Sequence, residues 1–522
     1  MLPDWMRESP SPFSKVLVAN RGEIACRIIR ACRELELQTV AVHSRGDTSA
    51  LHVELADEAV LLEGDLSATY LSIEAIIRAC VDTGAQAVHP GYGFLSERAE
   101  FAHAIEAAGL VWIGPPASAI ESMGDKVAAR RTMREAGVPV TPGGELSETD
   151  DLPARMLALH ELASRVGFPL LLKASAGGGG KGMRIVHSAG ELDSAYVAGQ
   201  REALSAFGDG TVYVESLLET PRHIEVQVLA DSEGDVIHLL ERECSVQRRH
   251  QKVVEEAPSA AIDVATRDAM GDAAVAAARA VNYLGAGTVE FLVSADGSFY
   301  FLEMNTRIQV EHPVTELITG VDLVQEQLRI AAGLPLSITQ SDVAADGHAI
   351  EARIYAEDPA NGFLPAGGKL VVWDPPVGPG IRLDEGVREG DDVSMDYDPI
   401  VAKLVVHAPD RDRAISRMSR ALSEFVVLGA TTNIEFLRDV VSHPGFAAAE
   451  TTTDFISRCW PEGWSADLDS DPVPPSAILL AAAGEQLALH RVGASAVGNV
   501  LDEEDVGPDP YNPFLTLRRS FP

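Results

Sequence analysis

Glu290, Glu303 and Asn305 are the residues whose types and spacing most clearly indicate chemistry. Two carboxylates placed face to face on neighbouring strands repel each other, so folding alone gives no reason to bring them together. A hard divalent cation removes that conflict, because Mg²⁺ binds a few carboxylate or amide oxygens and leaves its other positions to phosphates and water. The alternative is that both glutamates lie on a solvated strand face. A metal–nucleotide site is favoured because three more polar residues follow at once: Arg307, Gln309 and Glu311.

A β-hairpin is expected to bring these residues together. The runs 287–293 and 299–305 are rich in aromatic and β-branched residues, and Asp296-Gly297 between them is a strong hairpin signal. With Asp296 and Gly297 as the two turn residues, counting outward places Glu290 opposite Glu303. Side chains alternate along a strand, so Asn305 is predicted on the same face as Glu303.

Composition describes an ordinary globular enzyme with an unusual charge. The chain has 522 residues, 46% of them hydrophobic and 23% charged, and about three domains are expected. No apolar run approaches the length needed to span a bilayer. The formal net charge of −36 argues against binding to nucleic acid or to an anionic membrane. The five cysteines are scattered without metal-ligand spacing, and the N-terminus shows no secretion signal, so a cytoplasmic location is expected.

Lysine is used sparingly, and several lysines fall inside candidate motifs. Most cationic residues are arginines, and a lysine kept among them indicates a place where a compact point charge is needed. Lys126 is therefore a candidate phosphate contact. The lysines are at positions 15, 126, 173, 181, 252, 369 and 403.

The N-terminal region is predicted to hold a parallel sheet covered by helices. Strand 15–20, helix 21–35 and strand 39–43 form a βαβ unit. The Gly91-Tyr92-Gly93 loop is weak evidence for any function, because a tight turn accounts for it.

A glycine-rich hairpin is predicted at 169–186. Gly177–Gly180 lies between Lys173 and Lys181, and the next residues read as a strand, so neither a Walker A loop nor a dinucleotide fingerprint fits. Consecutive glycines hinge easily and offer backbone N–H groups to anionic oxygens. A lid that folds over a triphosphate is favoured over a plain surface hairpin.

The next segments carry further candidates. Alternation over 222–231 places His223, Glu225 and Gln227 on one strand face. The basic cluster within 244–256 stands out in a very acidic protein and is interpreted as an anion site, although pairing with its acidic neighbours remains an alternative for Arg248 and Arg249. A single amphipathic helix is expected over about 314–332, followed by a strand-rich region and an acidic, proline-containing linker near 461–475.

These motifs, in this order, resemble biotin carboxylase, the ATP-grasp component of acetyl-CoA, propionyl-CoA and related carboxylases. The resemblance covers about residues 14–460 and is most specific at 241–258 and 301–316. It implies α/β and α+β folding in three parts: a parallel-sheet pre-ATP-grasp domain (14–125), an ATP-grasp domain (126–335) with a mobile lid at about 140–213, and a C-terminal domain with an antiparallel-sheet core (345–460). A linker and partner-docking tail (461–522) would complete the chain.

The resemblance also assigns roles to residues. ATP would phosphorylate bicarbonate to carboxyphosphate, which delivers CO₂ to biotin. Glu311 would be the general base and Arg353 would bind biotin and stabilise its enolate, with Arg307 and Lys252 also catalytic. Magnesium or manganese, two ions, would be held by Glu290, Glu303 and Asn305. Bicarbonate would contact Lys252, Arg307, Gln309, Val310 and Glu311. ATP would contact Lys126, Lys173, Gly178, Gly179, Gly180, Lys181, Glu215, Leu217, His223, Gln247 and His250.

Biotin is expected to arrive on a partner. No lysine follows Lys403 in this sequence, so no Met-Lys-Met biotinylation site is present in it. We therefore expect a separate biotin carboxyl carrier protein and carboxyltransferase, and a homodimer or a larger carboxylase complex. Ser216 and Asp398-Pro399 depart from the family pattern, in which a lysine beside the adenine hinge and an Asp-Ser pair are usual.

Two other functions stay open on sequence grounds. One is another ATP-grasp ligase, of the carboxylate–amine or carbamoyl-phosphate type, which free biotin would not stimulate. The other is a non-catalytic nucleotide-sensing subunit, against which the complete set of catalytic residue types argues.

Overall fold

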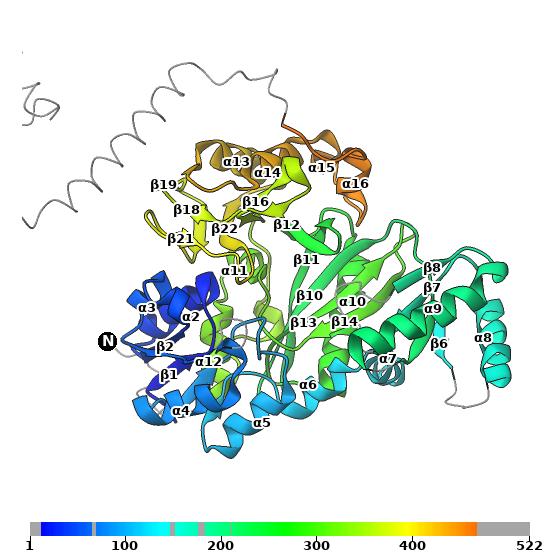
Figure 1. Ribbon diagram of the computed structural model, residues 1–522, viewed down its shortest axis with the longest axis horizontal. Coiled ribbons are helices and arrows are strands. Elements are labelled where there is room, and N and C mark those ends of the chain that lie inside the picture. Colours follow the sequence, from blue (N-terminus) through cyan, green and yellow to red (C-terminus); the bar gives the residue numbers. More distant parts are fainter. Residues whose placement is uncertain (1–11, 65–68, 147–151, 176–182, 209, 467–522) are drawn as a thin grey trace, which may run out of the picture. The chain divides into compact units, whose positions relative to one another are not determined.

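The computed structural model describes residues 12–64, 69–146, 152–175, 183–208 and 210–466 (Figure 1). These residues all belong to one compact unit, which extends to Ala466. The predicted glycine loop residues Gly178, Gly179, Gly180 and Lys181 and most of the tail 461–522 lie outside the described residues.

The N-terminal part is a five-stranded sheet in the order β3-β2-β1-β4-β5 (Figure 1, blue). All its strand pairs are parallel, which confirms the predicted parallel sheet. Its strands are β1 (Lys15–Val18), β2 (Gln38–His43), β3 (Glu58–Leu61), β4 (Ala87–His89) and β5 (Val111–Trp112). Its helices are α2 (Gly22–Glu34), α3 (Leu51–Leu55), α4 (Ile73–Thr83), α5 (Ala99–Ala107) and α6 (Ala117–Gly124). Apolar side chains pack on both faces of this sheet, as parallel sheets require.

A second part carries a small four-stranded antiparallel sheet in the order β6-β9-β7-β8. Its strands are β6 (Gly143–Glu145), β7 (Leu170–Ala174), β8 (Met183–Val186) and β9 (Val212–Ser216), and its helices are α8 (Leu152–Val166) and α9 (Ala189–Phe207). Helix α7 (Lys126–Glu135) follows β5 and α6 in the chain, and it is capped by Asp125, whose carboxylate accepts the N–H groups of Val127 and Ala128.

The largest sheet has eight antiparallel strands in the order β14-β13-β10-β11-β12-β15-β22-β20. Their bounds are β10 (Arg222–Ala230), β11 (Val236–Arg248), β12 (Gln251–Ala257), β13 (Gly285–Val293), β14 (Phe299–Asn305), β15 (His348–Tyr355), β20 (Ile381–Glu385) and β22 (Ile400–Ala408). This sheet is continuous across the predicted boundary between the ATP-grasp and C-terminal segments, because β12 pairs with β15.

Helices cover this sheet and fix which face each side chain takes. Helix α10 (Val264–Ala280) packs on the apolar residues of β10 and β13, including Ile224, Val226 and Val289 (Figure 1). At the other end, α13 (Arg411–Glu424) and α14 (Ile434–Ser442) pack on Ile350 and Ala352 of β15. The alternate, polar side chains of the same strands therefore face away from these helices. Short helices α15 (Pro444–Ala447) and α16 (Phe455–Cys459) and the two-stranded pieces β16 (Glu357–Asp358), β17 (Leu364–Pro365), β18 (Gly368–Lys369), β19 (Val372–Asp374), β21 (Asp392–Val393) and β23 (Val426–Leu428) complete the C-terminal part.

Two sequence predictions need correction. The single helix expected over 314–332 is two helices, α11 (His312–Thr319) and α12 (Leu323–Ala331), because Gly320 adopts a left-handed conformation (φ +72°) and ends the first. The turn of the β13–β14 hairpin is also longer than two residues. The Ser294 N–H donates to the Ser298 carbonyl at 2.8 Å, and Val293 pairs with Phe299.

Glu290 nevertheless lies opposite Glu303, as predicted. The longer turn shifts the register by one residue, and a β-bulge between the Phe291–Phe301 and Glu290–Glu303 pairs shifts it back. The pairing prediction is confirmed, although counting from the turn alone does not explain it.

A buried ion-pair cluster joins the N-terminal part to the large sheet. Glu316 of α11 pairs with Arg27 of α2 at 2.9 Å and with Arg382 of β20 at 2.7 Å. Burial alone would raise the pKa of Glu316, but these guanidinium groups outweigh it and lower the pKa to about 2. Glu316 is therefore ionised wherever the protein is folded near neutral pH.

We predict that Glu316→Gln lowers the free energy of unfolding by about 3 kcal/mol, because removing one partner leaves buried charges uncompensated. Since the folded-state pKa is depressed, the contribution is complete above the unfolded value and is lost as the pH falls towards about 2. Urea unfolding of the wild type and the variant should thus show a difference in the free energy of unfolding that is constant near neutral pH and becomes smaller in acid. Glu424→Gln, at an exposed pair with Arg420, is the control and should change little; an equal loss in both variants would contradict the prediction.

Candidate active site

A cavity of about 810 Å³ lies over the polar face of β10–β14 and beside the β6–β9 sheet. The structure brings almost every described candidate residue to its wall. These are Lys126, Lys173, Glu215, Leu217, His223, Gln247, His250, Lys252, Glu290, Glu303, Asn305, Arg307, Gln309, Val310, Glu311 and Arg353.

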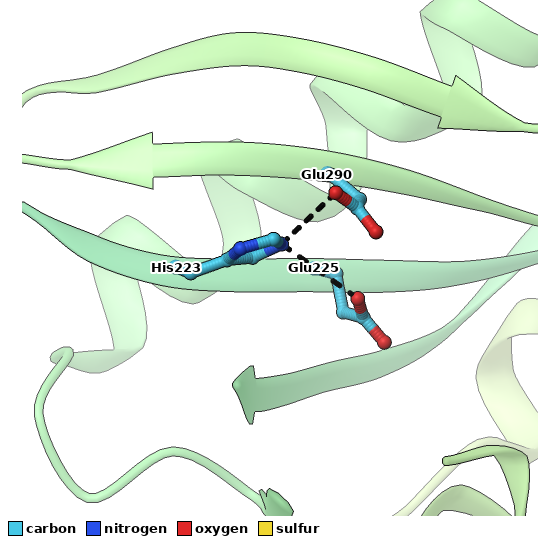
Figure 2. Close-up of side chains that lie close together, drawn as sticks. All are labelled: His223, Glu225 and Glu290. Atoms are coloured by element: carbon cyan, nitrogen blue, oxygen red, sulfur yellow. Dashed lines mark ion pairs between the residues drawn. The ribbon is translucent and has the colours of Figure 1, made fainter. Parts of the chain in front are cut away.

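Glu290 is the most heavily hydrogen-bonded acid of the cavity. It lies 3.0 Å from Nε2 of His223 and 2.8 Å from Nζ of Lys252, and it accepts the side-chain amides of Asn305 and Gln309, each at 2.9 Å. Figure 2 shows His223 on β10 pointing towards Glu290 and Glu225 on the same sheet face. Glu303, across the hairpin, is 38% exposed in its side chain and pairs with Lys126 at 3.4 Å.

Lys252 is the common partner of three carboxylates. Its ammonium lies 2.5 Å from Glu225, 2.8 Å from Glu290 and 2.6 Å from Glu311. Burial would lower the pKa of Lys252, but the three carboxylates raise it well above its ordinary value. In turn Lys252 overcomes the effect of burial on Glu290 and Glu311 and holds the pKa of both well below the ordinary range. Both acids are therefore ionised at neutral pH.

Arg353 forms the far wall, on β15. It donates to Glu255 at 2.6 Å and to Glu311 at 2.9 Å. Glu311 thus stands between an ammonium and a guanidinium, directly before helix α11. Arg307, on the loop from β14, contacts Asn305 at 2.8 Å and Glu97 of the N-terminal part at 3.0 Å.

Several residues that the family resemblance assigns to ATP pair with one another or with neighbours. Lys173 of β7 pairs with Glu215 of β9 at 2.6 Å, and Arg130 of α7 also bonds Glu215. Gln247 lies 3.2 Å from the ring of His223. The sequence predicts separate ATP contacts for Lys173 and Glu215, whereas the structure makes them an ion pair at the cavity wall.

Sequence reasoning missed three residues of this site. Arg242 of β11 is fully buried and donates to Glu225, Gln227, Thr288, Gln309 and Thr315 at 2.6–3.0 Å. Glu255 orients Arg353, and Arg130 orients Glu215. Their partners lie on other strands or helices, so local sequence patterns do not indicate these contacts. Only the presence of charges in otherwise fully buried strands could have indicated Arg242 and Glu255.

The hairpin residues fit a divalent cation. Glu290 and Glu303 offer hard carboxylate oxygens at one wall of the cavity, which is the donor type that Mg²⁺ prefers. The amide nitrogen of Asn305 donates to Glu290 and its amide oxygen accepts from Arg307, so Asn305 would have to release Arg307 to bind a cation. Soft ligands are absent from this set of three residues.

In the described residues, no helix has the length and apolar content needed to cross a bilayer.

Comparison with known proteins agrees with the fold and the cavity. The family model for the biotin carboxylase N-terminal domain matches residues 12–120, and that for the biotin carboxylase C-terminal domain matches residues 351–458. Between them, the model named carbamoyl-phosphate synthase L chain, ATP binding domain, matches residues 125–339.

Close relatives cover most of the chain. Biotin carboxylase of Nostoc sp. is 52% identical over 448 residues, which is 85% of this chain and 99% of the relative. The propionyl-CoA carboxylase alpha chain of Ruegeria pomeroyi is 49% identical over 504 residues, which is 92% of this chain and 72% of the relative.

Solved structures show the same architecture. The biotin carboxylase–β,γ-ATP complex from Campylobacter jejuni superposes with a TM-score of 0.81 at 42% identity, covering 85% of this chain and 99% of that one. The biotin carboxylase domain dimer of Hydrogenobacter thermophilus 2-oxoglutarate carboxylase, with MgADP and bicarbonate, gives 0.81 at 45% identity, covering 86% and 98%. The fold and the cavity therefore define an ATP-grasp ligase. The chain belongs to the biotin carboxylase family.

We predict that Lys252→Met lowers the free energy of unfolding by about 3 kcal/mol, because three buried carboxylates lose their shared cation. The melting temperature of the variant should fall accordingly. Millimolar Mg²⁺ should raise the melting temperature of this variant more than that of the wild type, since a cation near Glu290 replaces part of the lost charge. Thermal unfolding with Mg²⁺ and with EDTA measures both. Lys369→Met removes an exposed lysine and is the control. An identical Mg²⁺ shift in all three proteins would contradict the prediction.

Proposed function

We propose that this chain uses ATP and bicarbonate to carboxylate a carrier-bound biotin, by way of carboxyphosphate, as the first half-reaction of an acyl-CoA carboxylase. The observation that carries the proposal is the ion-pair chain from Glu290 through Lys252 to Glu311 and Arg353, which lies in one cavity and would join the metal, bicarbonate and biotin subsites.

The triphosphate would lie against the β6–β9 sheet and the β13–β14 hairpin. Lys126 and Lys173 supply point charges for phosphate oxygens, with the glycine loop 177–180 expected to contribute backbone N–H groups. Glu290, Glu303 and Asn305 would hold Mg²⁺, or Mn²⁺, and two ions are expected. A bound cation there would neutralise charge on the β- and γ-phosphates. Because Lys173 pairs with Glu215 in this structure, Lys173 would exchange that pair for a phosphate contact when the nucleotide binds.

Bicarbonate would take the place among Lys252, Arg307, Gln309 and the backbone of Val310. Glu311 then accepts its proton. Because the pKa of Glu311 is held well below its ordinary value, the carboxylate is ionised and available, but it is a weak base while Lys252 and Arg353 both pair with it. A bicarbonate that draws Lys252 away would raise the basicity of Glu311 at the moment of proton transfer.

Biotin would approach from the side of Arg353. Its guanidinium is positioned by Glu255 and Glu311, and it would stabilise the enolate that forms when the ureido nitrogen loses its proton. Exclusion of water by the lid would protect carboxyphosphate from hydrolysis.

The carrier and the carboxyltransferase would be partner chains. Similarity to the propionyl-CoA carboxylase alpha chain of Ruegeria pomeroyi and the mitochondrial methylcrotonoyl-CoA carboxylase subunit alpha of Arabidopsis thaliana supports a place in such a complex. The Hydrogenobacter domain is a dimer, which supports the expected homodimer.

A carbamoyl-phosphate-type ligase is the alternative that the central family model raises. That model covers only residues 125–339, and the models on either side are specific to biotin carboxylase. The relatives therefore favour biotin as the acceptor.

We predict that Glu311→Gln lowers bicarbonate-dependent ATP cleavage and free-biotin carboxylation together, by about 10²–10⁴-fold, because general-base catalysis is lost. Arg353→Met should lower biotin carboxylation by a similar factor but spare most of the bicarbonate-dependent ATP cleavage. Coupled ADP release and biotin-dependent fixation of labelled bicarbonate measure the two activities. Undiminished carboxylation by the Glu311 variant would show that Glu311 is not the general base and would contradict the prediction.

The tail is expected to dock a partner subunit. We predict that deleting residues 476–522 leaves ATP cleavage intact and abolishes co-purification with the partner chains. Size-exclusion chromatography of the co-expressed complex, with full-length chain as control, measures this. Unchanged complex formation by the truncated chain would refute it.

A further inference from the structure

Two buried glutamates face each other behind the active-site arginine. Glu255 of β12 and Glu351 of β15 are direct partners in the antiparallel pairing of these strands, and both are fully buried. Directly opposed side chains on antiparallel strands have Cβ atoms about 5 Å apart, and like charges at such positions repel. Glu351 has no role in any motif described above.

Hydrogen bonding at this pair is incomplete. One oxygen of Glu255 accepts from Arg353 at 2.6 Å, but its other oxygen has no partner among the described residues. Neither oxygen of Glu351 has one in the same part of the chain. An ionised carboxylate buried without a donor is very costly. Two ionised carboxylates offer only acceptors, so a hydrogen bond between them requires a proton on one.

The neighbouring cations are too few to allow both glutamates to be ionised. Lys403 of β22 lies next to the pair, but its ammonium contacts the Val310 carbonyl at 2.9 Å, Glu23 of α2 at 3.2 Å and Asp384 of β20 at 3.7 Å. Arg353 is already shared between Glu255 and Glu311. These cations therefore each face more than one carboxylate.

Lys403 and Arg353 are the cations that act on Glu351, and Glu255 and Glu311 are the carboxylates. Helix α11, which also packs on β15, carries His312, whose pKa burial lowers well below its ordinary value, so that this imidazole is neutral. Helices α13 and α14 pack on the opposite face of β15, against Ile350, Ala352 and Ile354. Burial raises the pKa of Glu351 well above its ordinary value, and Glu255 adds to this while Lys403 only partly offsets it. For Glu255, burial raises the pKa to about 7.

We propose that Glu255 and Glu351 share one proton through the catalytic cycle, and that Glu351 is a positioning residue that keeps a single negative charge behind Arg353. The inference rests on the proposed biotin carboxylase activity. With the proton in place, Glu351 donates to the free oxygen of Glu255, which fixes the carboxylate that orients the guanidinium. Without it, a further negative charge weakens the field that Arg353 presents to the biotin enolate.

The shared proton determines how the rate of biotin carboxylation changes with pH. Two acids that share a proton titrate as a pair, and the second proton loss is displaced upward. Below that point the pair carries one charge and Arg353 acts fully. As the pH rises through it, the pair gains a charge and biotin carboxylation falls, whereas ATP cleavage without biotin is affected less because it does not use Arg353.

The test compares wild type, Glu351→Gln and Glu256→Gln. The Gln amide cannot lose a proton in this range and still donates to Glu255. Glu256, the next residue on β12, is equally buried but is paired with His348 and Arg411 at 2.7 Å each, and it is the matched control. We expect E351Q to keep its neutral-pH rate within about twofold, and its rate relative to wild type to rise about fivefold by about pH 9.5. The E256Q ratio should stay flat.

Infrared spectra of the wild type and of each variant at neutral pH, compared as differences, test whether the pair carries a proton without relying on turnover. The wild type should show a carboxylic-acid carbonyl band that E351Q lacks and E256Q keeps. An unchanged band in E351Q, or an alkaline decline of biotin carboxylation identical to that of wild type, would overturn the inference. Failure of the proposed function is distinct, since the wild type itself would then show no biotin-dependent carboxylation.

Discussion

The compensation of buried carboxylates by too few cations is the constraint on which this site depends. Glu225, Glu290 and Glu311 meet at the single ammonium of Lys252, and Glu225 is also bonded to the buried Arg242. Each carboxylate is stable in the interior only while that pairing holds. Any cation or proton that enters the cavity therefore changes the charge state of all its members, which is the behaviour required of a site that binds a metal nucleotide and moves a proton.

One continuous eight-stranded sheet brings these charged side chains together. Strands β10–β15 place acids and bases from distant parts of the chain on one face, while α10 and α13 bury the apolar residues of the other. Arg307 with Glu97 and Lys403 with Glu23 tie the N-terminal part to the same face. Glu290, Lys252 and Arg353 thus lie on one continuous sheet.

Much of this arrangement could be predicted from the sequence, since hairpin and strand signals are local. The facing of Glu290 and Glu303 was predicted correctly, yet the turn was misjudged and an unrecognised bulge restored the register. Arg242 and Glu255 could not be predicted, because their importance comes from partners on other strands. Gly320 is a different case: the glycine that ends α11 and the Asp322 that caps α12 are both local signals in the sequence, and the prediction of one helix overlooked them.

Transfer of oxygen from bicarbonate to phosphate tests the central claim most directly. Purified chain is incubated with ATP, Mg²⁺, biotin and ¹⁸O-labelled bicarbonate, and the released inorganic phosphate is analysed by mass spectrometry. If Glu311 activates bicarbonate for attack on the γ-phosphate, each phosphate released with biotin turnover carries a labelled oxygen. Phosphate that carries only solvent oxygen would show that water is the nucleophile and would contradict the account.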